Sequence, residues 1–237
     1  MTADYLLFIL LGFTATLISA VFGLGTALVT LSLGAWILPV KEVIALSAVL
    51  FVASTLAKSL LYRQIIPWRA AIGISVISLP FAWLGGLCVD AVQADLLRRL
   101  LGLMVLASLA MSRFSCGGAK PGPVTLAFGA GIYGFISGLL GSGNLIKALL
   151  FRPMALGQTG FVGMMAATSV LTNVGKLGAY VQVGLLTREQ WMIMGGLIAA
   201  AVLAVIVGGA VLVRLEARRF ELGLQVILVI SALLLLL

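Results

Sequence analysis

The stretch ISAVFGLGT at residues 18–26 recurs as ISGLLGSGN at residues 136–144, an offset of 118 residues in a chain of 237. Three polar residues of a later segment repeat at the same offset without a gap: Lys58 and Lys176, Tyr62 and Tyr180, and Gln64 and Gln182. Glycine and leucine are abundant here, so the repeated Lys-x-x-x-Tyr-x-Gln carries more weight than their matches. The pattern predicts an internal duplication.

The composition places the chain in a lipid bilayer. Hydrophobic residues make up 62% of it and charged residues only 9%, whereas a soluble domain has about 25% charged residues. The apolar runs are continuous rather than alternating, which favours membrane helices over a β-barrel. The fold class expected is therefore all-α integral membrane, and cytosolic enzymes, nucleic-acid binders and secreted disulfide scaffolds are disfavoured. The 15 basic residues are scattered, so they indicate topology rather than a nucleic-acid surface.

Hydropathy predicts about five helical segments in each half of the chain. The segments lie near residues 5–22, 24–38, 43–61, 68–89 and 96–111, and then near 124–140, 145–156, 160–183, 191–213 and 222–237. This gives a first repeat at 1–112, a connecting loop at 113–121 and a second repeat at 122–237. The segments that begin at Leu24 and Leu145 reach only about 20 Å, short of a hydrocarbon core of about 30 Å. We expect each to be a broken or re-entrant half-helix.

The distribution of basic residues predicts the orientation. With both termini outside, most loops that carry Arg and Lys face the cytoplasm. Each repeat then crosses an odd number of times, so the two halves have inverted topology, a plan in which sites lie near the midplane. We expect the first segment to be a retained span rather than a cleaved signal peptide.

The paired glycine motifs predict helix breaks with an anion-binding character. Glycine permits the backbone that ends one helix, and the amides that open the next helix lack intrahelical acceptors and attract anions. Close helix packing is the alternative explanation for these glycines. The candidate binding residues from these motifs are Gly23, Gly25, Thr26, Gly141, Ser142, Gly143 and Asn144.

Lys58, Lys176 and Asn173 complete the candidate site. Each lysine follows a long apolar run, where an ammonium is costly unless it faces water or an anion. The alternative is that both lysines extend along the lipid to the interface. Asn173 is a candidate donor to an anion, Tyr62 and Tyr180 are expected in the interfacial aromatic belt, and Lys147 is expected as a cytoplasmic flanking charge, with a cationic entrance as the alternative.

Catalytic, metal and cofactor sites are not expected. The chain has no histidine, and its seven acidic residues fall near predicted segment ends or loops, which leaves no Ser-His-Asp set and no usual proton relay. No Walker-type phosphate loop occurs. Cys88 and Cys116 lie at opposite ends of a predicted span, so we expect ordinary thiols rather than a disulfide.

The motifs resemble those of the sulfite exporter TauE/SafE family of bacterial membrane transporters over nearly the whole chain. Gly23-Leu24-Gly25 and Gly141-Ser142-Gly143 resemble its repeated Gly-x-Gly-Gly-Gly signature, YRQIIPWR at residues 62–69 resembles its loop before the fourth segment, and Ala167-Thr168-Ser169 matches a recurrent triplet. The resemblance implies transport of sulfite, organosulfonates or related sulfur-containing anions. The later signature glycines are replaced here by Thr26 and Ala27, and by Asn144 and Leu145, which leaves the identity of the anion open.

The sequence hypothesis is an exporter of a small sulfur-containing anion, such as sulfite or sulfoacetate, that works by alternating access in the bacterial inner membrane. The expected partners are the anion and membrane lipid, with no nucleic acid and no cofactor, and homo-oligomerisation is left open. An anion channel and a non-transporting scaffold or assembly factor are the alternatives. An enzyme is not expected.

Overall fold

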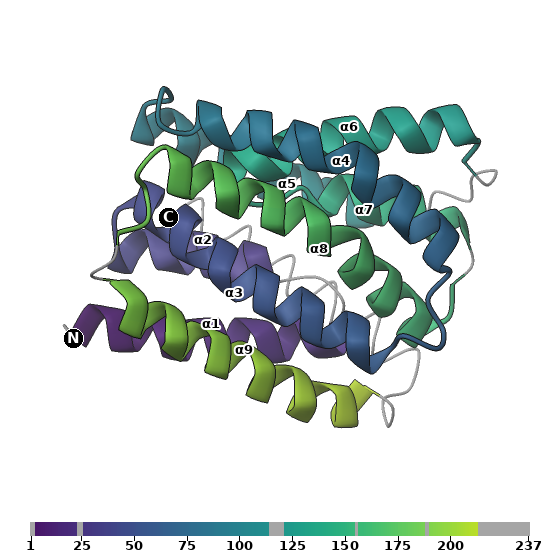
Figure 1. Ribbon diagram of the computed structural model, residues 1–237, viewed down its shortest axis with the longest axis horizontal. Helices are drawn as coiled ribbons and strands as arrows, with labels where there is room; N and C mark the ends of the chain where they lie inside the picture. The colour runs from purple at the N-terminus through teal and green to yellow at the C-terminus, as the bar shows by residue number, and fades with distance from the viewer. Residues whose placement is uncertain (1–2, 23–25, 114–120, 155, 188–189, 213–237) are drawn as a thin grey trace.

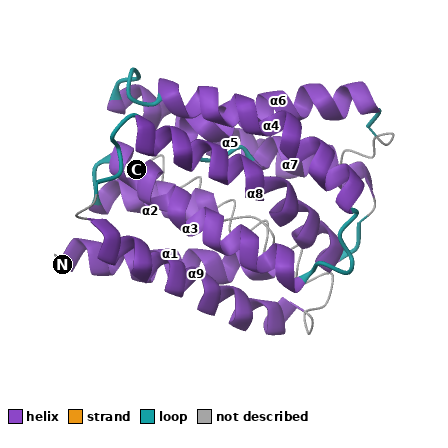
Figure 2. Cartoon of the chain, in the orientation of Figure 1, coloured by secondary structure: helices purple, strands orange, loops and turns teal. Residues whose placement is uncertain are grey.

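The structure is a computed structural model that describes residues 3–22, 26–113, 121–154, 156–187 and 190–212. Every regular element in these ranges is a helix (Figures 1 and 2), so the all-helical class is confirmed. The first half contains α1 (Ala3–Phe22), α2 (Thr26–Ile37), α3 (Val40–Leu61), α4 (Trp68–Cys88) and α5 (Ala94–Arg113). The second half contains α6 (Pro123–Leu140), α7 (Asn144–Phe151), the 3₁₀ turn η1 (Arg152–Met154), α8 (Gln158–Gln182) and α9 (Trp191–Leu212). The tenth expected segment, at 222–237, lies outside the described residues.

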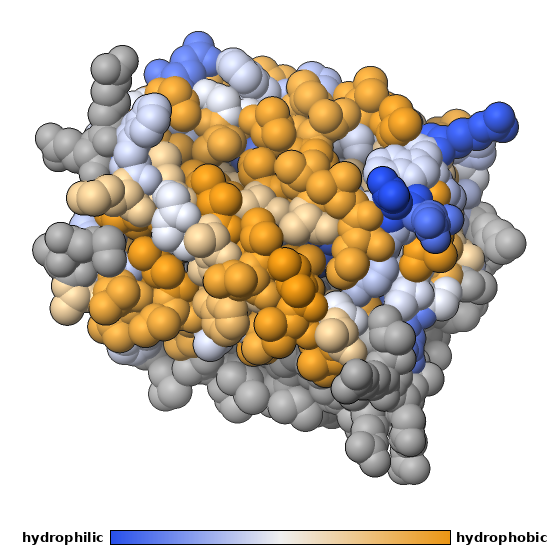
Figure 3. All heavy atoms as spheres, turned by 60° about the horizontal axis from the view of Figure 1, so that its bottom comes forward, coloured by the Kyte–Doolittle hydropathy of each residue, from blue (hydrophilic) through white to orange (hydrophobic). Residues whose placement is uncertain are grey.

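Helices long and apolar enough to cross a membrane form most of the described chain. Five of the described helices meet both conditions, namely α1, α3, α4, α6 and α9. Their outward side chains are largely hydrophobic, and Figure 3 shows a broad apolar face with hydrophilic residues at its edges. Apolar side chains can face lipid at no cost, so the chain is a multi-pass membrane protein.

Local sequence signals determine where several helices begin and end. Pro39 and Pro67 directly precede α3 and α4, and Pro123 opens α6, positions at which the missing N–H of proline costs little. Gly141 ends α6 in the left-handed conformation with φ of 78°, which a glycine adopts without strain. The predicted break at this motif is therefore confirmed. The equivalent residues 23–25 lie outside the described part of the chain.

The helices α1, α3 and α9 run in the same direction. Tyr5 on α1 bonds to Glu42 near the start of α3, and Ser19 near the end of α1 bonds to Lys58 near the end of α3. α9 packs along both helices, with Gly196 in its first half against Ile9 of α1 and Gly208 in its second half against Leu17 and Ala20 of α1. The three helices form the lower part of the molecule in Figure 1.

The helices α4, α6 and α8 also run together, but in the opposite direction to α3. Asn173 of α8 bonds to the Phe51 carbonyl, while Gly163, earlier in α8, lies against Tyr62, beyond the end of α3. Within this group, Gly134 and Gly138 of α6 lie against successive turns of α4. Helices one repeat apart, α1 and α6, α3 and α8, and α4 and α9, therefore have opposite directions.

Glycines allow α4 and α6 to approach closely. A Cβ atom at Gly134 would collide with the main chain of Ser78, and one at Gly138 would approach the Gly86 nitrogen to 2.7 Å. Small residues at four-residue spacing permit such backbone contact between membrane helices. The packing explanation for glycine thus applies to α6, before the break at Gly141.

The two short helices α2 and α7 both fold back along the helix that precedes them. Along α7, Gly143 lies against Tyr133 of α6, and Leu150 lies against the earlier Gly129, so α7 returns antiparallel to α6. Similarly, Gly34 near the end of α2 lies against Phe8 of α1 and Val43 at the start of α3. With 12 and 8 residues, α2 and α7 rise only about 18 and 12 Å, so each is too short to cross a hydrocarbon core of about 30 Å, as expected of half-helices.

Candidate functional site

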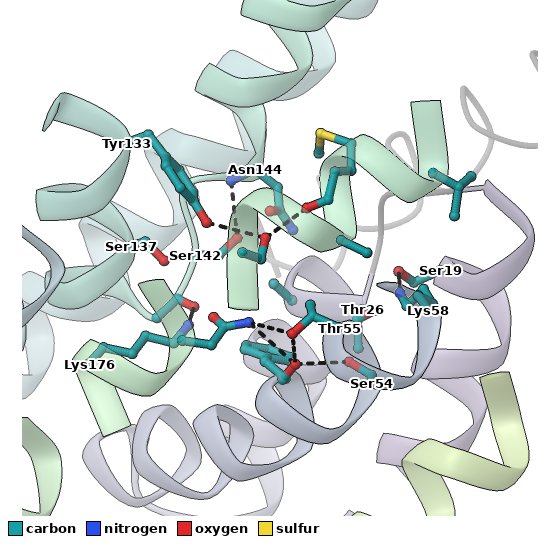
Figure 4. A pocket seen from close by; sticks show the side chains of 18 residues that line it. Ser19, Thr26, Ser54, Thr55, Lys58, Tyr133, Ser137, Ser142, Asn144 and Lys176 are labelled. Atoms are coloured by element: carbon teal, nitrogen blue, oxygen red, sulfur yellow. Dashed lines mark hydrogen bonds between the residues drawn. The ribbon is translucent and has the colours of Figure 1, made fainter. Parts of the chain in front are cut away.

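A small internal cavity lies where the helix starts of α2 and α7 meet the central helices α3 and α8. Its volume is about 30 Å³, enough for on the order of two water molecules in its present form. Residues from both halves of the chain form its wall, and Figure 4 shows polar side chains directed into it from several helices. Among the described residues of the wall there are two lysines and no Asp or Glu. The cavity is therefore a cationic environment.

The first residues of both half-helices line this cavity. Thr26 opens α2 and Asn144 opens α7, and both contribute to the wall together with Gly141 and Ser142. The first amides of a helix have no intrahelical acceptor, and the helix dipole adds positive potential there. Ser142 Oγ accepts a long bond of 3.5 Å from the Asn144 amide. Two helix starts thus point positive ends at one cavity.

Asn173 lines the cavity and bonds to the residue that lies 118 positions earlier in the chain. Its Nδ2 donates to Thr55 Oγ1 at 3.2 Å, and the two residues are 118 positions apart. Other wall residues also occur in pairs that are 118 positions apart: Ser19 with Ser137, Thr26 with Asn144, and Lys58 with Lys176.

Lys58 and Lys176 are both buried and line the cavity from opposite sides in Figure 4. Lys58 Nζ donates to Ser19 Oγ at 2.9 Å, and Lys176 Nζ donates to the Gly141 carbonyl at 2.6 Å. The Lys176 ammonium also lies 4.8 Å from the centre of the Phe51 ring. Because both side chains turn inward, the alternative in which they extend to the membrane surface is wrong.

Lys147 does not have the position that its sequence context predicts. Instead of lying as a flanking charge on the cytoplasmic side, its side chain has no exposed surface. The return of α7 between α6 and α8 buries it, and its ammonium donates to the Met165 carbonyl at 2.7 Å and to Ser169 Oγ. It also lies 4.6 Å from the centre of the Tyr133 ring. A signal was present, because Lys147 follows Asn144 by three residues and so shares its helix face.

Several other polar wall residues were also missed. Tyr133, Ser137 and Ser169 line the cavity from α6 and α8, and the Tyr133 hydroxyl donates to Ser169 Oγ at 3.2 Å. Ser169 belongs to a cluster of hydroxyl residues that the sequence marks as possible anion donors, but hydroxyls commonly bond within their own helix in membranes, and nothing in the sequence singled out Tyr133 or Ser137. The offset of 118 residues does connect Ser137 with Ser19, and this could have identified the pair.

The remaining predicted residues have other positions. Gly143 does not line the cavity; a Cβ there would lie 2.7 Å from the Tyr133 carbonyl, so its role is close packing. Tyr62 and Tyr180 are buried rather than interfacial, which makes the aromatic-belt prediction wrong: helix packing covers both rings, and the Tyr180 hydroxyl donates to the Gly138 carbonyl. Gly23 and Gly25 lie outside the described residues.

The fold and the cavity define a class: a multi-pass helical membrane protein with a buried cationic site between its two halves. The chain belongs to the Sulfite exporter TauE/SafE family, whose model matches residues 8–235. No curated protein and no solved structure matches it. Membership of this family of membrane transporters implies membrane transport of the sulfite or sulfonate type, in agreement with a cavity whose described wall residues include no carboxylate.

Proposed function

We propose that this protein exports a small sulfur-containing anion, sulfite or an organosulfonate such as sulfoacetate, across the bacterial inner membrane by alternating access. The observation that carries the proposal is the cavity itself, where two buried lysines and two helix starts meet and where the described part of the wall contains no carboxylate. An oxyanion would compensate this positive potential and accept hydrogen bonds from the ammonium groups and the helix amides.

The residues proposed to bind the anion come from both halves of the chain. Thr26, Asn144 and Ser142 lie at the helix starts, and Lys58 and Lys176 lie on either side of them. Gly141 ends α6, and its carbonyl accepts a hydrogen bond from Lys176 that positions the ammonium beside the cavity. Gly23 and Gly25 are proposed to form the equivalent break before α2.

The helix directions support an alternating-access mechanism. Equivalent helices of the two halves run in opposite directions, as two inverted repeats at 1–112 and 122–237 would, and α4 packs against α6 and α8 while α9 packs against α1 and α3. The helix α4 of the first half therefore packs on the second half, and α9 of the second half packs on the first half. Rocking of one half against the other would expose the central site first to one side of the membrane and then to the other.

The test combines binding and flux with the full-length chain. The melting temperature of the detergent-purified protein is measured with sulfite, thiosulfate, sulfoacetate, taurine, acetate and phosphate, because a ligand that prefers the folded state raises it. Uptake of the stabilising anion into proteoliposomes is then measured with and without the same anion on the opposite side.

A carrier shows selective stabilisation by a sulfur oxyanion, saturable flux and acceleration by countertransport. Flux that neither saturates nor shows countertransport would establish a channel instead. A folded protein that binds and moves none of these anions would overturn the proposal in favour of a scaffold.

A further inference from the structure

The buried Lys147 lies directly behind the cavity wall and has no counterpart in the other half of the chain. The residue 118 positions earlier is Val29, and the equivalents of its neighbours Tyr133 and Ser169 are Ala15 and Phe51. The duplication therefore does not explain this cation. Neither does membrane topology, because the side chain has no contact with the surface.

The contacts of Lys147 determine which way the wall hydroxyls can donate. An ammonium has only donors, so Ser169 Oγ must accept from it, and the same oxygen also accepts from the Tyr133 hydroxyl at 3.2 Å. The hydroxyl hydrogen of Ser169 is then the one part of this group that can still donate. It is directed at the Met165 carbonyl at 2.9 Å, an oxygen that also accepts a hydrogen bond from Lys147. An anion in the cavity would be the stronger acceptor for that hydrogen.

The charge balance around the cavity points to the charge of the ligand. Lys58 and Lys176 form part of the wall, and Lys147 touches two further wall residues, Met165 and Ser169. In the described part of the chain, the hydrogen bonds of these three ammonium groups go to carbonyl and hydroxyl oxygens, and no carboxylate lines the cavity. Removing a doubly charged anion from water costs more than removing a singly charged one, and a site with several cations compensates this larger cost better than a site with few.

We propose that Lys147 is a positioning and specificity-determining residue. By donating to Ser169 Oγ it leaves the Ser169 hydroxyl only as a donor, able to turn from the Met165 carbonyl to an anion in the cavity, and it makes the site prefer doubly charged oxyanions over singly charged ones of the same shape. This inference rests on the proposed function and adds the charge of the substrate to it. Sulfite dianion and sulfoacetate fall in the preferred class, whereas taurine and other singly charged or zwitterionic sulfonates do not.

The test compares pairs of anions that differ in charge but little in size. Dissociation constants are measured by calorimetry for sulfate against methanesulfonate, and for sulfoacetate against 2-hydroxyethanesulfonate, at neutral pH. The unmodified protein is expected to bind the dianion of at least one pair on the order of tenfold more tightly, as one additional charge-assisted hydrogen bond provides.

Lys147→Met and Lys147→Gln then assign the preference to this residue. Both substitutions are expected to reduce the affinity ratio of dianion to monoanion to within about threefold. Lys41→Met, at a lysine paired with Asp90 away from the cavity, is expected to leave this ratio unchanged. Burying a charge without an opposite charge is costly, and the described partners of the Lys147 ammonium are neutral oxygens. The melting temperature of the unliganded Lys147→Met protein is therefore expected to stay level or rise. If the role of Lys147 were purely structural, the substitutions would instead lower the melting temperature and leave the affinity ratio of dianion to monoanion unchanged.

Equal affinities within both pairs for the unmodified protein would overturn the charge preference, and a preference that survives in the folded Lys147 variants would overturn the role of this residue. Lys147→Gln serves if the methionine variant does not fold. Failure of the proposed function is a separate result, in which the unmodified protein binds none of the sulfur anions.

Discussion

Replacing Lys176 by methionine tests the anion site most directly. Lys176 is 1% exposed and lines a cavity of about 30 Å³, so little water is present to replace the ammonium when it is lost. A hydrogen bond to a charged group contributes about 1.5–3 kcal/mol. Taking about 2 kcal/mol, the Lys176→Met change is expected to weaken anion binding about 30-fold.

The melting temperature of the Lys176→Met protein is expected to change little, in contrast to its affinity for the anion. The ammonium of Lys176 bonds to a main-chain carbonyl rather than to a carboxylate, and methionine of similar length restores the apolar packing against Phe51. Binding is measured by calorimetry with the anion that stabilises the unmodified protein, and folding by the melting temperature and by gel filtration. Lys41→Met is the matched control. A folded Lys176→Met protein whose affinity changes less than twofold would refute the reasoning.

Three further changes test the site and the packing. Lys58→Met is expected to weaken binding of the same anion by on the order of tenfold in calorimetry, and unchanged affinity would remove it from the site. Gly134→Val is expected to separate α4 from α6 and lower the melting temperature by several degrees, whereas Gly73→Ala, which meets nothing within 4 Å, should have little effect; equal effects would contradict the close packing. Tyr180→Phe removes a buried hydrogen bond to α6 and should cost about 1 kcal/mol of unfolding free energy. Tyr62→Phe should cost nothing, because the hydroxyl of Tyr62 has no hydrogen-bond partner in the structure, and an equal loss in both variants would contradict this assignment.

The helices and the break at Gly141 could be predicted because they depend on local properties. Apolar runs of about 20 residues, prolines at helix starts and a glycine at a helix end act within one segment. The offset of 118 residues also allowed Lys58 and Lys176 to be identified together, and it contains the pair Thr55 and Asn173, which the structure shows in contact. These features required no knowledge of tertiary packing.

The position of Lys147 could not be predicted in the same way. A charge in a short segment is assigned by hydropathy to the nearest water, and nothing local indicates that α7 returns between α6 and α8. The directions of Tyr133 and Ser169 depend on the same return. The surroundings of Lys147 are thus a part of the site that depends on the return of α7, whereas wall hydroxyls such as Ser19 and Ser54 of the first half lie on long helices.

The difference between the two halves has a consequence for the proposed mechanism. In a carrier with two identical inverted repeats, the inward-open and outward-open states would exchange the conformations of the repeats and would have equal energies. Here lysine occurs at both position 58 and position 176. At the positions 118 residues before Lys147, Tyr133 and Ser169, by contrast, the sequence has Val29, Ala15 and Phe51. The symmetric pair provides positive charge in both states, whereas the contacts of Lys147 tie α7 to α8 in only one half. On this mechanism, a preference for one of the two states arises at the second re-entrant helix, and the bound anion meets an environment that differs between its two ends.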